Sequence, residues 1–142
     1  MINQNITLEQ LNALNKNTMG EFLGIEYTEI GTHHLCGRMP VDNRTRQPLG
    51  LLHGGASVVL AETLGSVAAT CCVNRETHYC VGLEINANHV KSVRDGYVYG
   101  KASAIHIGGS TQIWEIRITS ETGGLVCISR ITMAVLAHRK HA

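Results

Sequence analysis

The chain lacks the cysteine spacing that marks disulfide frameworks and zinc sites. It has five cysteines, an odd number, and no two of them form a C-x-x-C pair. An odd count argues against a framework of paired disulfides, and the missing pair argues against a zinc site. We therefore expect reduced thiols and neither a metal nor a redox cofactor.

Runs of charge and long apolar runs are missing too. The 12 basic and 11 acidic residues nearly cancel, and no cluster of Lys or Arg is long enough to mark a nucleic-acid or membrane surface. No window approaches the roughly 20 apolar residues of a membrane span, and the N-terminus has no basic region followed by an apolar one. We expect a cytoplasmic protein that binds a small molecule or a second copy of itself.

No internal repeat or low-complexity tract divides the chain. A length of 142 residues fits one domain, and such a chain can bury roughly 68% of its unfolded surface. We predict a single domain over 1–142, with an N-terminal helical segment at 1–20 and a short basic tail at 137–142.

Local patterns predict an α+β fold. Thr7 followed by Gln10 is typical of a helix start, and leucines at three-residue spacing continue the helix to Leu14. A segment that is apolar on every side, ending near Cys72, predicts a helix enclosed by protein. Turn residues separate the segments for which we predict strands, which are 25–30, 33–39, 79–86, 96–106, 111–119 and 125–136. One buried helix facing one long curved antiparallel sheet accounts for these elements.

Glu62 is the only fully charged side chain between Arg46 and Arg75. It lies inside the apolar helix, where burial is expected. Burying an unpaired carboxylate costs several kcal/mol. Such a group is mostly retained for chemistry, so Glu62 is the first candidate for a catalytic residue.

Two segments, 39–68 and 81–89, resemble the hotdog-fold acyl-CoA thioesterases. The order and spacing of Gln47, His53, Gly54 and Glu62 are the specific part of this signature. The likeness extends from about Thr7 to Leu136. It is strongest to the branch that acts on 1,4-dihydroxy-2-naphthoyl-CoA, on aryl carrier proteins of enterobactin synthesis and on 4-hydroxybenzoyl-CoA.

The resemblance implies an assembly as well as a fold. It implies a sheet wrapped around a central helix and a homodimer formed by pairing two sheets edge to edge, often doubled to a homotetramer. It also implies active sites at the dimer interface, with Glu62 of one subunit facing Gln47, His53 and Gly54 of the other.

Thioester hydrolysis gives each signature residue a chemical reason. The tetrahedral intermediate carries a negative oxygen, which the backbone N–H of Gly54 can stabilise at a helix N-terminus. Gly55 permits close approach of a ligand, or both glycines only serve the turn. The Gln47 amide would polarise the thioester carbonyl. His53 would orient the thioester or the pantetheine arm, and otherwise caps the helix.

Glu62 has two possible roles, which the sequence does not separate. Its carboxylate either attacks the thioester carbon or deprotonates the attacking water. Ser66 lies at i+4 on the same helix face, where its hydroxyl can hold that carboxylate or a water. Ser66 otherwise bonds back to a helix carbonyl.

Further residues are candidates for binding the substrate. Val67 would shape the acyl pocket, and His89 and Lys91 would meet phosphate oxygens of coenzyme A. The remaining candidates line the expected path of the coenzyme, and they are Val81, Gly82, Gly108, Gly109 and Ser110. Four other histidines show no metal-ligand spacing with carboxylates and are expected to be exposed, namely His33, His34, His138 and His141.

These residues favour an enzyme that hydrolyses acyl-CoA thioesters, with 1,4-dihydroxy-2-naphthoyl-CoA as the first substrate expected. Coenzyme A is part of the substrate, and no cofactor is expected. A proofreading thioesterase acting on an acyl or aryl carrier protein is the alternative substrate class. A non-catalytic acyl-CoA-binding hotdog module and a hydratase of similar fold are alternatives of other classes.

Overall fold

The computed structural model describes residues 1–139, which form three helices and six strands. The elements are α1 (Leu8–Leu14), α2 (Met19–Phe22), β1 (Glu26–Ile30), β2 (His34–Pro40), α3 (Gly54–Thr70), β3 (His78–His89), β4 (Tyr97–Ile107), β5 (Thr111–Ser120) and β6 (Leu125–Ala137). Every predicted helix and strand is present, and α2 has no counterpart among the predictions. Residues 140–142 of the predicted basic tail, His141 among them, lie outside the described residues.

The start of α1 follows the capping rule that its sequence predicts. The Thr7 hydroxyl accepts a hydrogen bond from the Gln10 N–H at 3.2 Å, and the Gln10 side chain accepts one from the Thr7 N–H at 3.0 Å. This reciprocal pair satisfies two donors that the first helical turn leaves open. The N-terminal helix therefore begins where Thr7 places it.

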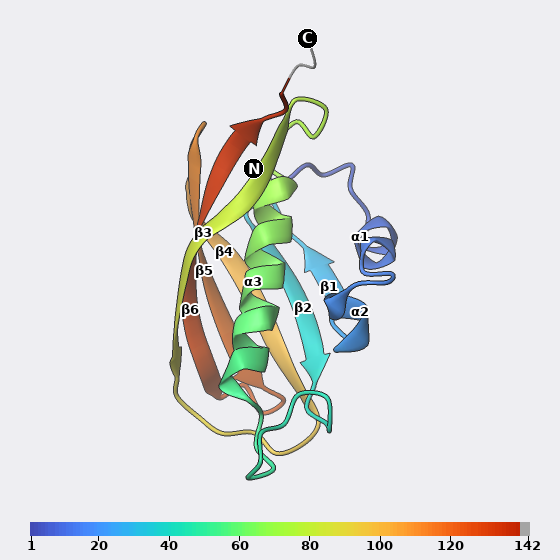
Figure 1. Cartoon of the computed structure of the whole chain (residues 1–142), viewed down its shortest axis with the longest axis vertical. Coiled ribbons are helices and arrows are strands. Elements are labelled where there is room, and N and C mark those ends of the chain that lie inside the picture. Colours follow the sequence, from blue (N-terminus) through green and yellow to red (C-terminus); the bar gives the residue numbers. More distant parts are fainter. Residues whose placement is uncertain (140–142) are drawn as a thin grey trace.

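The six strands form one antiparallel sheet in the order β1-β2-β4-β5-β6-β3. Figure 1 shows this sheet curving around α3, with α1 and α2 beside β1. The predicted α+β arrangement, the hotdog fold, is confirmed. No helix within residues 1–139 is both long and apolar enough to span a membrane.

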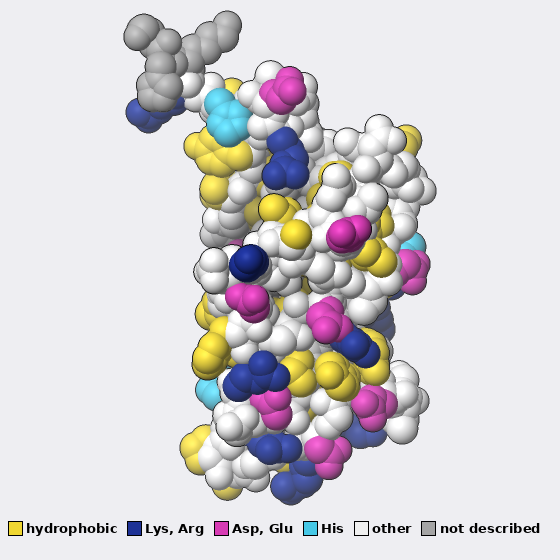
Figure 2. Space-filling view, turned by 90° about the vertical axis from the view of Figure 1, so that its right-hand side faces the viewer, with side chains coloured by type: hydrophobic (Ala, Val, Ile, Leu, Met, Phe, Trp, Pro, Cys, Tyr) yellow, Lys and Arg dark blue, Asp and Glu magenta, His cyan; other side chains and the backbone are white. Residues whose placement is uncertain are grey.

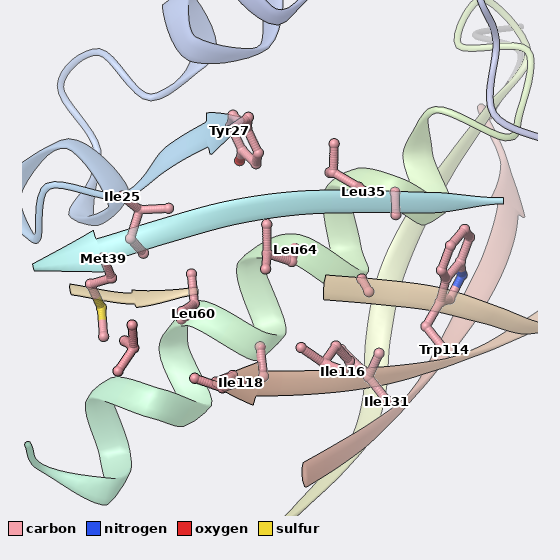
Figure 3. Close-up of a cluster of buried hydrophobic side chains, with 14 of the residues drawn as sticks. Ile25, Tyr27, Leu35, Met39, Leu60, Leu64, Trp114, Ile116, Ile118 and Ile131 are labelled. Carbon is pink, nitrogen blue, oxygen red and sulfur yellow. The ribbon is translucent and has the colours of Figure 1, made fainter. Parts of the chain in front are cut away.

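The hydrophobic core lies between α3 and the concave face of the sheet. Figure 3 shows Leu60 and Leu64 of α3 on the side of the helix that faces β2, with Ile116, Ile118 and Ile131 of the sheet in the same cluster, and all of these side chains are buried. Gly100 of β4 lets the helix approach closely, because a Cβ atom there would lie 2.5 Å from Leu64 Cδ1. The core thus fixes the height of α3 above the sheet.

The prediction that protein encloses α3 on every side is wrong for the single chain. Its sheet-facing positions, such as Leu60, Ala61 and Leu64, are buried, whereas Val59, Glu62 and their neighbours on the opposite face are only half-buried. The reason is geometric, because one curved sheet covers one side of a helix. The apolar residues on the other side remain available to a further surface.

Candidate active site

A pocket of about 300 Å³ lies at the N-terminal end of α3. It brings together four of the predicted site residues, Gln47, Gly54, His89 and Lys91, from a loop, a helix start and the end of β3. The rest of its lining consists of Leu51, Leu52, Ser57, Val90, Ser92 and Val126. Ser57 was not among the predicted residues, because a serine one turn into an apolar helix gives no distinct signal.

The loop that carries Gln47 is anchored by Thr45. The buried Thr45 hydroxyl donates a hydrogen bond to the Pro40 carbonyl at 2.8 Å, and the Thr45 carbonyl accepts one from the His53 N–H at 2.8 Å. Thr45 therefore connects the end of β2 with the start of α3. Its role depends on the folded loop, so sequence reasoning had no signal for it.

The Gln47 side chain is oriented by its own loop. Its Oε1 atom accepts a hydrogen bond from the Leu49 backbone N–H. A backbone N–H pairs only with the oxygen end of the amide, so the NH₂ end points away from that contact. This NH₂ group has no hydrogen-bond partner within residues 1–139, and it is free to donate to an oxygen in the pocket.

His53 is the N-cap residue of α3, the alternative role considered from the sequence. Its Nδ1 atom accepts a hydrogen bond from the Gly55 N–H at 2.8 Å. A neutral ring that accepts at Nδ1 carries its proton at Nε2. The exposed His53 ring therefore presents an Nε2–H donor, and the capping contact fixes its tautomer.

Gly54 supplies the free donor of the helix start. The N–H groups of Gly55, Ala56 and Ser57 all donate to His53, whereas that of Gly54 has no partner among the described residues. The His89 ring covers Gly54, since a Cβ atom there would lie 2.8 Å from His89 Nε2. A pocket that contains an unpaired N–H at a helix N-terminus is suited to bind a negative oxygen.

Glu62 lies further along α3 and faces β3. Glu62 is half-buried, and its carboxylate has neither a hydrogen bond nor an ion pair within residues 1–139. A Cβ atom at Gly82 would lie 2.6 Å from Glu62 Oε1, so glycine at this position makes room for the carboxylate. Ser66 does not hold Glu62 in this chain, because its hydroxyl is directed at Met133 Sδ, 3.9 Å away.

Within one chain, the Glu62 carboxylate and the unpaired Gly54 N–H lie apart along α3. Eight residues separate Gly54 from Glu62, a rise of about 12 Å along the helix. Groups that act on one carbonyl must meet it at about 3 to 3.5 Å. One chain therefore carries both halves of the predicted machinery without bringing them to the same reacting atom.

The remaining predicted binding residues do not join the first pocket. Gly108 and Gly109 line another pocket of about 270 Å³ beside Cys72 at the C-terminal end of α3, and Ser110 follows them. Val81 is exposed on β3, and Val67 is half-buried against the core. The structure thus does not gather the predicted coenzyme-binding residues in one place: some lie at each end of α3, and Gly82 lies against Glu62 between them.

His34 does not match the expectation of an exposed histidine without a carboxylate partner. It is half-buried, and its Nε2 atom lies 2.7 Å from Glu29 Oε1 across the β1–β2 hairpin. His33 is exposed, and His138 lies beside Tyr79 with the ring centroids 5.2 Å apart. Pairing between β1 and β2 created the His34 contact, which spacing along the sequence did not reveal.

Charges of both signs are interspersed on the face that Figure 2 shows. Lys and Arg side chains alternate there with Asp and Glu, without a continuous basic patch among the described residues in view. Ion pairs among the described residues include Arg44 with Asp42 at 2.7 Å and Arg38 with Glu26 at 2.8 Å. This face has no extended field of one sign.

Comparison with known proteins shows the family of the chain. The thioesterase superfamily profile matches residues 49–127. A 1,4-dihydroxy-2-naphthoyl-CoA hydrolase of Escherichia coli is 54% identical over 131 residues, which cover 92% of this chain and 96% of that protein. The proofreading thioesterase EntH of Cronobacter turicensis is 49% identical over 133 residues, covering 94% and 96%.

A solved structure agrees with these sequence matches. The crystal structure of a mutant thioesterase from Pseudomonas aeruginosa superposes with a TM-score of 0.94 at 51% identity, covering 96% of this chain and 99% of that one. The family match spans α3 with Glu62 and the strands β3, β4 and β5. The chain therefore belongs to the thioesterase superfamily, and it is an enzyme of that class, a hydrolase of thioesters.

Proposed function

We propose that the enzyme hydrolyses aryl-CoA thioesters, with 1,4-dihydroxy-2-naphthoyl-CoA as the leading substrate. The observation that carries the proposal is the convergence of two unused donors, the Gly54 N–H and the Gln47 NH₂, in one pocket. These donors are suited to stabilise the oxyanion of a thioester under attack. The 54% identity with a hydrolase named for this substrate supports the choice of acyl group.

In this proposal a second copy of the chain completes the site. Glu62 lies about 12 Å along α3 from Gly54, so the carboxylate that acts at a given pocket comes from the partner subunit. The half-open face of α3 and the uncovered edge of β3 lie next to Glu62, where a partner would bind. Dimer and tetramer both satisfy this requirement.

Glu62 then acts on the thioester carbon held by Gln47 and Gly54. In one route its unpaired carboxylate attacks that carbon, the C–S bond breaks to release coenzyme A as the thiolate, and water then hydrolyses the mixed anhydride and supplies the proton of the thiol. In the other route the carboxylate removes a proton from the water that attacks the carbon, and that proton passes to the sulfur of coenzyme A as the C–S bond breaks. His53 and Ser66 are proposed to position substrate or water. His89 and Lys91 at the pocket are proposed to meet the phosphates of coenzyme A.

The test is release of free coenzyme A thiol from a panel of thioesters. The panel contains 1,4-dihydroxy-2-naphthoyl-CoA, benzoyl-CoA, 4-hydroxybenzoyl-CoA and aliphatic acyl-CoAs. We expect aryl esters to be preferred and Glu62→Gln to lower kcat by about 10³-fold, within the range for a positioned acid or base. Glu115→Gln, which alters another half-buried carboxylate, is the matched control and should retain activity.

A carrier-protein thioester is the second candidate, favoured by the 49% identity with a proofreading thioesterase. Assays of the same acyl group as a coenzyme A thioester and as a carrier-protein thioester distinguish the two candidate substrate classes. A kcat/KM that is higher for the carrier thioester would replace the coenzyme A proposal and retain the mechanism. If Glu62→Gln hydrolyses both kinds of thioester as fast as the parent enzyme does, the mechanism itself is overturned.

The cytoplasmic location and the absence of a cofactor stay predictions. Activity that survives exhaustive treatment with a chelator is the outcome expected for a cofactor-free thioesterase.

A further inference from the structure

The β1–β2 hairpin places three metal-binding side chains together on the sheet face that points away from α3. Glu29 of β1 pairs with Cys36 of β2, and His34 lies two residues before Cys36 on the same strand. Paired residues and residues two apart share one face of a sheet. The alternate position, Leu35, is buried in the core on the helix side.

The ligand atoms of these three residues are already close. A Glu29 carboxylate oxygen, a His34 ring nitrogen and Cys36 Sγ all lie within 4.8 Å of one another, and the first two are 2.7 Å apart. In a tetrahedral zinc centre, ligand atoms about 2.0 to 2.3 Å from the metal are spaced roughly 3.3 to 3.6 Å apart. Small side-chain shifts would therefore bring the three atoms to zinc-binding distances.

We propose that Glu29, His34 and Cys36 bind a zinc ion, with water as the fourth ligand. Thiolate and imidazole select zinc over magnesium and calcium, which prefer oxygen ligands. This site is separate from the thioester site, because it lies on the opposite face of the sheet from α3. It differs from the expectation of no metal, which followed from the spacing of cysteines and not from strand pairing.

Charged groups of β1, β2 and β4 face one another around the three ligands. The hydrogen bond from His34, and then the charge of His34, lower the pKa of Glu29, so its carboxylate is charged. Burial raises the pKa of the Cys36 thiol, and the Glu29 charge adds to this rise while Lys101 of β4 opposes it.

Gly31 in the hairpin turn fixes the place of the imidazole. A Cβ atom at Gly31 would lie 2.1 Å from His34 Cε1 and 2.4 Å from Nδ1. The ring therefore packs directly over this glycine. An alanine at position 31 would displace His34 from the other two ligands.

Cobalt(II) is the probe for this site, because thiolate ligation gives it a near-ultraviolet charge-transfer band. Titration of the chelator-treated full-length protein should saturate at one cobalt ion per chain, and added zinc should remove the band. Cys36→Ser should abolish the band, and both Cys36→Ser and His34→Gln should raise the cobalt Kd by at least about 100-fold. That is the upper end of what loss of an outer-shell partner costs.

Cys72→Ser is the matched control, since Cys72 is another half-buried free thiol. It should bind cobalt as the parent protein does. Circular dichroism checks that each variant is folded. Absence of saturable binding, or a charge-transfer band that persists in folded Cys36→Ser, would overturn the proposal. These readouts do not involve thioester hydrolysis, so they are independent of the proposed function.

Discussion

The two edge strands of the sheet, β1 and β3, differ in length and in what covers their open sides. β1 is five residues long, and α1 covers its open side: the Asn12 side chain donates to the Tyr27 carbonyl at 3.1 Å and accepts from the Tyr27 N–H at 2.9 Å. β3 is twelve residues long, and its apolar side chains Tyr79, Val81 and Leu83 are exposed. A long, uncovered, apolar edge is a site for pairing with another strand.

The difference indicates which edge is closed and which is free to pair. Asn12 makes the two hydrogen bonds to the Tyr27 backbone that a neighbouring strand would make. Two residues earlier in the chain, the Ile25 carbonyl accepts a hydrogen bond from the Asn15 side chain at 2.8 Å. Within residues 1–139, no helix or loop closes the outer side of β3 in this way. Because Glu62 faces Gly82 of β3, the free edge and the proposed catalytic carboxylate are neighbours.

The largest expected effect comes from placing a charge on the free edge. Leu83 is 64% exposed in the single chain, so Leu83→Lys should cost the folded chain little. In a dimer paired through β3 the lysines would lie against apolar surface. We expect dissociation to monomers and a loss of thioesterase activity of about 100-fold or more, measured by sedimentation and by thiol release.

Leu14→Lys is the control for that experiment. Leu14 is 53% exposed at the end of α1, near the closed edge. The same substitution there should change neither the oligomeric state nor activity. An active Leu83→Lys monomer would contradict a site shared between subunits.

The second prediction tests the contact between β3 and the proposed catalytic carboxylate, Glu62. Gly82→Ala places a methyl group 2.6 Å from the present position of Glu62 Oε1, so the carboxylate must move. We expect kcat to fall about 10- to 100-fold, as displacement of a catalytic group by about 1 Å can cost. Oligomeric state and unfolding midpoint should change little.

Gly109→Ala serves as the comparison, because a Cβ atom there meets nothing within 4 Å. Steady-state kinetics of the two variants separate a positioning effect from a general effect of alanine. A Gly82→Ala enzyme with unchanged kcat would show that the carboxylate tolerates displacement.

Local sequence patterns predicted the elements, because each depends on neighbours along the chain. Thr7 with Gln10 sets the start of α1, and the turn glycines Gly96 and Gly123 have the positive φ angles that tight turns require. The end of β3 was placed at 86 and lies at His89, since pairing with Cys127 of β6 extends the strand. Such an extension depends on a residue far away in sequence.

The site was predictable only as a set of residues, and its geometry was not. The spacing of Gln47, Gly54 and Glu62 marked them as candidates, but their distances follow from the packed helix and loop. The half-buried state of Glu62 follows from a sheet that covers one side of α3. The contacts of Asn12 with Tyr27 join residues that no local pattern connects.

The third prediction concerns pH and the closed edge. Burial raises the pKa of Tyr27 to about 12, with the neighbouring Cys71 adding to this rise. The unfolded chain ionises this tyrosine near pH 10, whereas the folded chain does not until about pH 12. The contribution of neutral, buried Tyr27 to the unfolding free energy is therefore complete below pH 10 and is lost as pH rises from 10 to 12.

Two pKa units correspond to about 2 to 3 kcal/mol of unfolding free energy. Urea unfolding of the parent and of Tyr27→Phe at pH values from 9 to 11 measures the slope. The unfolding free energy of Tyr27→Phe should fall less steeply with rising pH than that of the parent. The fall that remains is due to Cys71, whose pKa burial raises to about 11. Equal slopes for both proteins would mean that Tyr27 ionises in the fold as it does in the unfolded chain.

The smallest effect is expected from opening the closed edge at Asn12. Asn12→Ala removes both hydrogen bonds to Tyr27 and leaves one backbone N–H and one carbonyl of β1 without these partners. Water can reach this edge from the side, so we expect a loss of about 1 to 2 kcal/mol in unfolding free energy and unchanged kcat. Asn5→Ala, at an exposed position near the N-terminus, is the control and should change stability less.

If Asn12→Ala instead forms larger oligomers that retain activity, then the β1 edge pairs as soon as it is uncovered, and the asparagine serves to restrict pairing to β3. If stability and oligomeric state are both unchanged, then the short length of β1 already protects this edge, and the contrast with β3 is one of length and apolar surface alone.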